Sequence, residues 1–330
     1  MIVVHTLAEG QQNGASRFHR HMLASGEPIP PHTRWIDLVE PTREDDRKVE
    51  DHLGISVPTR EDMGDIEPSE LLYAEDGARY LTVRLVSRAQ NEPEIEGVSI
   101  ILKDGVMITV RYVDPMSFQM FANRIARPGA CEPTMEGLVT ALLDAIIDRA
   151  ADVLQMTGSE LDKTSRRVFE GGGDARRRSE EYTEVLKALG RHGDLISKIR
   201  ESLVSVERVL LYLSAMYRNA SISKDLREEV KSTLRDLQSL EEHATFQSQK
   251  IQFLLDATLG LVNLEQNNII KLFSVMAVIF MPPTLIASIY GMNFEIIPEL
   301  KWPLGYPMAL AAMVLAAILP YLFFRWKKWL

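Results

Sequence analysis

Hydrophobic and polar positions divide the 330-residue chain into three parts. Up to residue 130, short runs rich in Val and Ile predict strands at 2–7, 34–39, 80–88 and 98–113. Between 131 and 271, apolar residues recur mostly every three, four or seven positions, which predicts long helices. Two later windows of 23 residues, 272–294 and 302–324, contain no charged residue. We therefore expect an α+β membrane protein with an N-terminal α/β domain followed by helices.

The first part, residues 1–130, carries local signals that fit a small α/β domain. Residues 42–53 read as a short helix, with Thr42 as N-cap and an acidic first turn. The pairs Asp76-Gly77 and Asp104-Gly105 are typical of tight turns in hairpins. The N-terminus lacks a basic segment followed by a long apolar one, so it does not read as a signal peptide.

The second part, residues 131–271, predicts three helices. They cover 134–169, 179–219 and a segment from about 223 that shows no stop signal before the first apolar window. Its heptad pattern is imperfect, because Glu241 and Glu265 occupy positions that a coiled coil would fill with apolar residues. An unbroken helix to residue 290 would be on the order of 100 Å long. Such a stalk would couple a cytoplasmic event mechanically to the membrane.

The two uncharged windows predict transmembrane helices. A bilayer core of about 30 Å needs about 20 apolar helical residues. Burial as core helices of a soluble domain is the alternative, and it fits poorly with two such windows flanked by charges.

The charges beside these windows predict the orientation in the membrane. Basic residues precede the first window and follow the second, whereas the loop 295–301 carries two carboxylates, so the positive-inside rule puts both chain ends in the cytoplasm and the loop outside. The basic C-terminal segment 325–330 would then be cytoplasmic. The basic residues would form a collar that anchors to lipid phosphates or, alternatively, acts as an electrostatic gate. The collar consists of Lys271, Arg325, Lys327 and Lys328, and the loop carboxylates are Glu295 and Glu299.

Charge and composition exclude several classes of function. The net charge is −9, and since residues 271–330 carry +3, residues 1–270 carry −12. An acidic body does not suit nucleic-acid binding; it suits the handling of cations, although a solvated acidic surface explains it equally well. The single cysteine, Cys131, excludes an internal disulfide and a cysteine-based zinc site. Motifs of nucleotide-binding and hydrolytic enzymes are absent from the sequence, so we expect passive transport and no enzyme.

Two transmembrane helices in one chain cannot enclose an aqueous path, so a pore would need several copies. One face of the first window is rich in small and polar residues. Helix packing in the membrane favours the same residue types, and periodicity does not separate packing from pore lining. The face comprises Asn267, Ile270, Ser274, Ala277, Met281, Thr284, Ser288 and Gly291.

The end of the first window carries the most specific motif. Tyr290-Gly291-Met292-Asn293-Phe294 is followed by a Pro-Glu-Leu-Lys-Trp loop and a Lys-Lys-Trp-Leu terminus, and Phe280-Met281-Pro282 precedes it. This arrangement resembles the CorA family of magnesium channels. The likeness is closest over about residues 262–330 and loose over the acidic N-terminal domain.

The resemblance implies a funnel-shaped homopentamer in the cell inner membrane, gated by cytoplasmic magnesium. In it, Asn293 would form a ring at the outer mouth, placed by Gly291 and Met292. Cobalt and nickel are further expected ions. The next pore constrictions, carried over by position, would be Thr284, Met281, Phe273 and Asn267.

The chemistry of magnesium agrees with an amide ring. Mg²⁺ gives up its hydration water reluctantly and prefers octahedral oxygen ligands. Neutral amides of Asn293, and of Asn267 at the other end, can hydrogen-bond the hydrated ion without holding it too tightly for conduction. Gly291 and Asn293 would also suit a left-handed helix C-cap. Glu295 and Glu299 would concentrate cations at the mouth or simply keep the loop polar.

The regulatory sites are not identified by motif. Carboxylates that could bind cytoplasmic magnesium between subunits lie on the last cytoplasmic helix, where a solvated helix face is the alternative. These candidates are Asp225, Glu228, Glu229, Asp236, Glu241, Glu242 and Asp256.

Two other functions remain open at the level of sequence. A related proton-coupled zinc transporter would share the layout, but it departs at the methionine of the motif, which is intact here as Met292. A membrane-anchored sensor with a coiled-coil stalk is the other, although the predicted external part is only a short loop.

Overall fold

The structure is a computed structural model that describes residues 1–7, 18–24, 26–64, 67, 71–89, 92–170, 175–219, 222–293 and 301–327. Two compact units make up the chain. The first comprises Met1–Glu170 and Val185–Leu254, and the second comprises Gly171–Glu184 and Leu255–Leu330.

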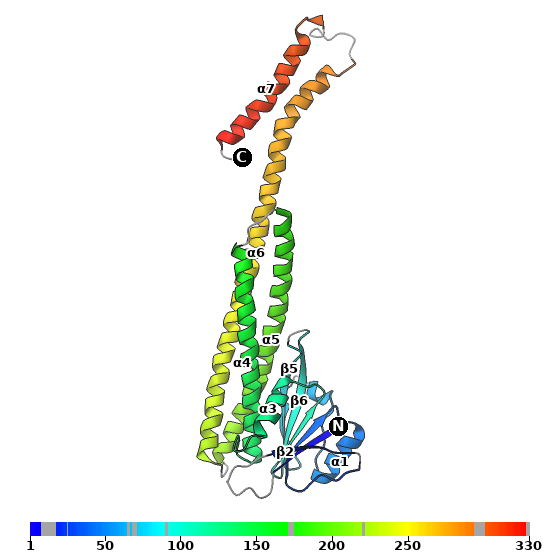
Figure 1. Cartoon of the computed structure of the whole chain (residues 1–330), viewed down its shortest axis with the longest axis vertical. Helices are drawn as coiled ribbons and strands as arrows, with labels where there is room; N and C mark the ends of the chain where they lie inside the picture. Colours follow the sequence, from blue (N-terminus) through cyan, green and yellow to red (C-terminus); the bar gives the residue numbers. More distant parts are fainter. Residues whose placement is uncertain are drawn as a thin grey trace. The chain divides into compact units, whose positions relative to one another are not determined.

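A seven-stranded sheet is the centre of the first unit (Figure 1). Its strand order is β2-β1-β3-β7-β6-β5-β4, and every neighbouring pair is antiparallel except β3 and β7. The strands are β1 Ile2–Leu7, β2 Phe18–Met22, β3 Thr33–Val39, β4 Leu72–Glu75, β5 Ala78–Ser87, β6 Glu94–Lys103 and β7 Val106–Arg111.

The four predicted strand runs are confirmed, with one refinement. The run 98–113 contains parts of two strands, β6 and β7, which turn at Asp104-Gly105 where both residues have positive φ. The Asp76-Gly77 turn likewise joins β4 to β5, again with positive φ at both residues. The two edge strands, β2 and β4, were not predicted: β2 is mostly polar and exposed, and β4 has only four residues.

Successive side chains along each strand point to opposite faces of the sheet, and both faces carry apolar residues. On one face Ile36 and Leu38 pack with Val49 of helix α1, Arg43–Leu53. Thr42 caps α1 as predicted, in a reciprocal capping box with Asp45. On the other face, Trp35 stacks on His5 and contacts two phenylalanines of helix α3, Met116–Ile125.

Long helices complete the first unit, where α4 and α5 run beside the first part of α6 (Figure 1). Gln247 Nε2 of α6 donates to Leu154 O of α4 at 2.8 Å, and Ser205 Oγ of α5 accepts from Arg84 N of β5 at 2.9 Å. The helices are α4 Met135–Glu170, α5 Ala175–Asn219 and α6 Lys224–Tyr290.

Helix α6 runs without a break from Lys224 to Tyr290, as the sequence predicts. In its first half, Val230, Leu237, Ala244 and Ile251 are buried at intervals of seven residues. The heptad stripe is therefore the face that packs on the neighbouring helices. Pro282-Pro283 lies inside the helix, which stays continuous there.

The second unit contains the last part of α6 and helix α7, Gly305–Trp326. Both helices are long and apolar enough to cross a membrane, and 6% of each apolar window is buried. The alternative of buried core helices is therefore wrong for the described residues, since the apolar side chains face outward. Two helices of this kind support a membrane protein.

Candidate pore and selectivity site

The predicted selectivity motif begins where helix α6 ends. Gly291 N donates to Ala287 O at 2.9 Å, and Met292 N donates to Ile289 O at 3.3 Å, so the last turn tightens. Neither Gly291 nor Asn293 has a positive φ. The alternative of a left-handed cap is therefore wrong. A Cβ on Gly291 would lie 3.1 Å from Ala287 O, so the helix end is already close-packed at this residue.

Asn293 follows directly, and its side chain is exposed. Among the described residues, its amide makes no hydrogen bond that would hold it inside its own chain. The carboxamide can therefore accept from and donate to water or a hydrated ion. Met292 is also exposed beside it. The predicted loop carboxylates Glu295 and Glu299 lie outside the described residues.

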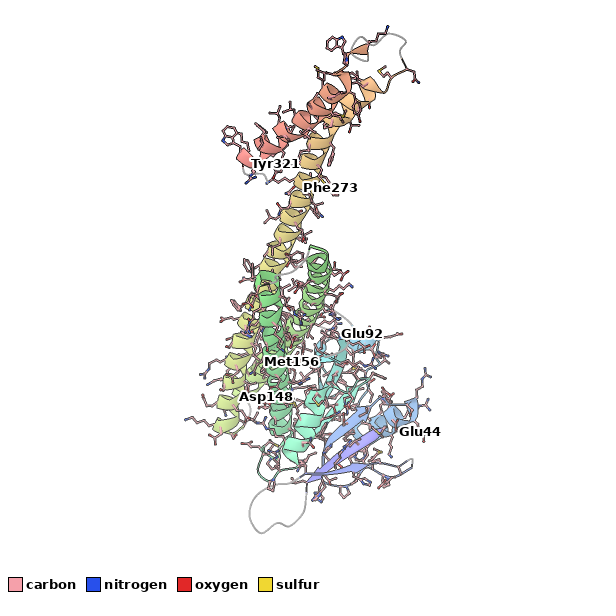
Figure 2. The ribbon with its side chains drawn as sticks, turned by 45° about the horizontal axis from the view of Figure 1, so that its top comes forward. Glu44, Glu92, Asp148, Met156, Phe273 and Tyr321 are labelled. Carbon is pink, nitrogen blue, oxygen red and sulfur yellow. The ribbon has the colours of Figure 1, made fainter. Side chains whose placement is uncertain are left out.

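The four predicted pore-lining residues all lie exposed on α6. Phe273 is 63% exposed and Met281 is 66% exposed, and Figure 2 shows Phe273 on the part of α6 in the second unit. Asn267 and Thr284 are exposed as well. One copy of the chain therefore leaves this face open to lipid or to other copies.

Hydroxyl groups on this face are satisfied within the helix. Thr284 Oγ1 donates to Phe280 O at 2.7 Å, and Ser274 Oγ donates to Ile270 O at 2.8 Å. This back-bonding uses the hydroxyl hydrogen and leaves the oxygen lone pairs free to accept. The face thus presents acceptors, which suit the hydrogens of an ion's hydration shell.

The basic collar is exposed where it is described. Lys271 and Arg325 are exposed, and the Lys327 ammonium lies 5.4 Å from the centre of the Trp326 ring. Lys328 lies outside the described residues. Paired basic and aromatic side chains at a helix end are typical of the membrane interface.

Carboxylates crowd one region of the first unit. Burial raises the pKa of both Asp148 and Glu229, and the nearby Asp144 raises both further, whereas Arg124 opposes this. Arg124 Nη1 also hydrogen-bonds Asp144 Oδ2. Sequence reasoning named Glu229 but missed Asp144 and Asp148, which the spacing of four along α4 places on one helix face.

Other predicted acidic candidates are less crowded. Glu228 pairs with Lys231 at 2.9 Å on an exposed surface. Burial, followed by the charge of Glu207, raises the pKa of Glu241. Over the described ranges, no group of three or more His, Cys, Asp or Glu residues is arranged to hold a metal ion.

The chain is similar in sequence to known proteins over most of its length. The family model described as "CorA-like Mg2+ transporter protein" matches residues 31–328. The chain is 37% identical over 297 residues to the magnesium transport protein CorA of Salmonella typhimurium, covering 90% of this chain and 92% of that protein. It is 36% identical, over the same shares, to the protein of that name from Escherichia coli K12.

A solved structure agrees in fold. The CorA magnesium transporter from Methanocaldococcus jannaschii superimposes with a TM-score of 0.75, covering 100% of this chain and 99% of that chain at 19% identity. At this identity the likeness supports the fold alone: a soluble α/β domain followed by two C-terminal helices that are apolar enough to span a membrane.

Proposed function

The chain belongs to the CorA-like Mg²⁺ transporter family, and from this premise we propose that it forms a passive, homopentameric channel for magnesium uptake. The observation that carries the proposal is Gly291-Met292-Asn293 at the end of the apolar helix α6, with the Asn293 amide exposed and unbonded among the described residues. Cobalt and nickel, as ions of similar charge and hydration, are further expected cargo.

Selection of a hydrated ion follows from the chemistry of the amide. A ring of Asn293 side chains offers neutral oxygens and N–H groups to the water shell of Mg²⁺, which the ion releases reluctantly. A carboxylate ring would bind the ion more strongly and release it slowly, whereas conduction needs weak binding. Gly291 and Met292 set the position of the amide at the helix end.

The rest of the pathway would follow the exposed face of α6. Thr284 offers oxygen lone pairs, Met281 and Phe273 offer apolar constrictions, and Asn267 offers a second amide. Apolar constrictions can close a pore by excluding water. We assign gating to Phe273 because its ring is the bulkiest of these side chains.

Regulation by cytoplasmic magnesium would act through carboxylates of the first unit. When ionised, Asp144 repels both Asp148 and Glu229, and this repulsion raises the pKa of each beyond the effect of burial. Cation binding between subunits would relieve this repulsion and favour a closed state, and loss of the cation would favour an open state. Continuity of α6 from the first unit to Tyr290 provides a mechanical link.

We place the protein in the cell inner membrane, with both termini in the cytoplasm. The basic collar (Lys271, Arg325, Lys327 and Lys328) would lie at the cytoplasmic interface, consistent with the positive-inside rule. Glu295 and Glu299 would lie at the outer mouth and raise the local cation concentration.

Flux in liposomes tests the proposal. The purified full chain is reconstituted with a magnesium indicator inside, and a potassium diffusion potential is applied with equal pH on both sides. We expect Mg²⁺ entry that rises with an inside-negative potential, with Co²⁺ and Ni²⁺ as slower or competing ions. Zinc entry driven by a pH gradient without magnesium flux would instead establish the proton-coupled alternative.

Two further outcomes bear on the assembly. Chemical cross-linking in detergent should end at five copies of the chain, and a monomer or dimer would refute the pore. Absence of any ion flux from a five-copy assembly would favour the membrane-anchored sensor.

A further inference from the structure

A small cavity lies in the first unit, whereas the residues of the proposed ion path belong to the second unit. Strand β5, the start of α3, and helices α4 and α5 line it, and its volume is about 60 Å³. One water needs roughly 10–15 Å³ on this measure, so the cavity has room for a ligand of several atoms. Figure 2 labels Asp148 and Met156 on α4; the lining residues Arg149 and Val153 lie between them in the sequence.

Ser87 provides an unsatisfied polar group in this cavity. On β5, Leu81, Val83 and Leu85 point into the core on one face, and Ser87 is the next residue in that row. Ser87 is 6% exposed, and its buried Oγ has no hydrogen-bond partner among the described residues. A buried hydroxyl without a partner destabilises the folded state, because it has lost its hydrogen bonds to water. A ligand in the cavity would remove that cost.

Arg149 of α4 brings a positive charge to the same cavity. It is partly buried, and within the described ranges its guanidinium has neither an ion pair nor a hydrogen bond. Arg88, the other cationic residue of the lining, is instead paired with Glu94 at 3.1 Å. The described lining includes no carboxylate. The charge of Arg149 therefore has no counter-ion there.

The start of helix α3 adds to the positive potential. Met116 and Ser117, its first two residues, line the cavity, and Pro115 at the N-cap position supplies no side-chain cap. The N–H groups of a first helical turn carry partial positive charge and favour anions. Ser117 and Ser202 add two further hydroxyl groups to the lining.

We propose that this cavity binds a short-chain carboxylate of the size of acetate or propionate. The carboxylate would accept hydrogen bonds from the Arg149 guanidinium and the Ser87 hydroxyl near the α3 N-terminus. The short aliphatic part would lie against the apolar wall formed by Leu85, Ile146 and Val153. A guanidinium presents a planar fork that matches a carboxylate. The site is independent of the ion path and of the proposed transport function.

Isothermal titration of the full chain in detergent tests the site. Sodium propionate is the probe, with sodium chloride at equal ionic strength as the reference salt. We expect saturable binding of one propionate per chain with a Kd on the order of 1 mM, and no matching heat from chloride. Loss of saturation, or chloride binding of equal strength, would overturn the proposal.

Three variants separate binding from folding. Arg149→Met and Ser87→Ala should each weaken propionate binding about tenfold or more. Ser87→Ala also removes the unsatisfied hydroxyl, so its ligand-free unfolding temperature should stay equal or rise while binding falls. Arg166→Met, on an exposed face of the same helix and outside the cavity lining, should bind like the parent. Equal binding by all three variants would show that the cavity is not the site.

Discussion

Arg111 and Asp37 form a buried ion pair across the parallel strands β7 and β3, with Arg111 Nη2 and Asp37 Oδ2 3.0 Å apart and both side chains less than a tenth exposed. Asp37 Oδ1 also accepts from Thr109 Oγ1 at 2.7 Å, and Thr109 Oγ1 accepts from Trp35 Nε1 at 2.9 Å. The network fixes the parallel pairing of β3 and β7 on the sheet face that also carries helix α3.

We expect Asp37→Ala to destabilise the first unit strongly. Without Asp37, the buried Arg111 keeps only the half-exposed Asp114 as a carboxylate partner, 2.7 Å away, so we expect a cost of about 3 kcal/mol, the lower end for breaking a buried pair. The midpoint of thermal unfolding of the full chain in detergent measures this loss. Asp194→Ala, which breaks an exposed pair with Lys198 on α5, serves as the control and should cost under about 0.5 kcal/mol. Equal shifts in the two variants would contradict a stabilising role for the buried pair.

Much of the fold could be predicted because its signals are local. The period of α6, the Thr42 cap and the Asp-Gly turns each depend on residues close in sequence. The parallel pairing of β3 with β7 could not be predicted, since these strands are about 70 residues apart and neither sequence indicates which strand it pairs with. Edge strand β2 was missed because its exposed polar residues carry no strand pattern.

The candidate sites differ in the same way. Asn293 could be assigned from a contiguous motif at the end of an apolar window. The crowding of Asp144 and Asp148 with Glu229 depends on how α4 packs on α6, and the meeting of Ser87 with Arg149 depends on how β5 packs on α4. Tertiary packing brings these elements together, so the sequence indicates only that Asp144 and Asp148 share one face of α4.

Gly97 of strand β6 should not tolerate a side chain. A Cβ at this position would lie 2.2 Å from Met63 O, inside contact distance, and Met63 is itself buried. We expect Gly97→Ala to destabilise the protein by about 1–3 kcal/mol through overpacking. In contrast, Gly190→Ala on α5 meets open space and should stabilise by about 0.5–1 kcal/mol. Unfolding midpoints that move in the same direction would contradict this account.

Acid should destabilise the first unit through His5. This residue is 2% exposed, and burial, followed by the charge of Arg20, lowers its pKa from 6.5 to about 3. Above pH 6.5 both folded and unfolded chains hold the ring neutral, so His5 adds no pH dependence. Below it the unfolded chain binds a proton that the folded chain excludes, and stability falls by about 2–3 kcal/mol between pH 6.5 and 4.5.

His5→Phe isolates this contribution. The ring would keep the stack on Trp35, whose centroid lies 4.1 Å from that of His5, and it cannot titrate. The difference in unfolding midpoint between pH 7 and pH 4.5 should be smaller in this variant than in the parent. His19→Phe on the exposed face of β2 should retain the full difference. An unchanged difference in His5→Phe would place the acid sensitivity elsewhere.

Asn293→Ala should strongly reduce selective magnesium entry while leaving the assembly intact. The amide makes no hydrogen bond among the described residues, so its removal should change the stability of the fold little. A loss of flux would therefore measure the interaction of the amide with the ion. Without the ring of amides, the hydrated ion loses fixed hydrogen-bond donors and acceptors at the pore mouth, and mobile water does not replace them. We expect magnesium flux in liposomes to fall about tenfold or more, with unchanged cross-linked mass.

Asn268→Ala, beside Asn267 on α6 but off the predicted pore face, is the matched control and should conduct like the parent. Full flux and unchanged ion preference in Asn293→Ala would remove the amide ring from the mechanism, while leaving membership of the family untouched.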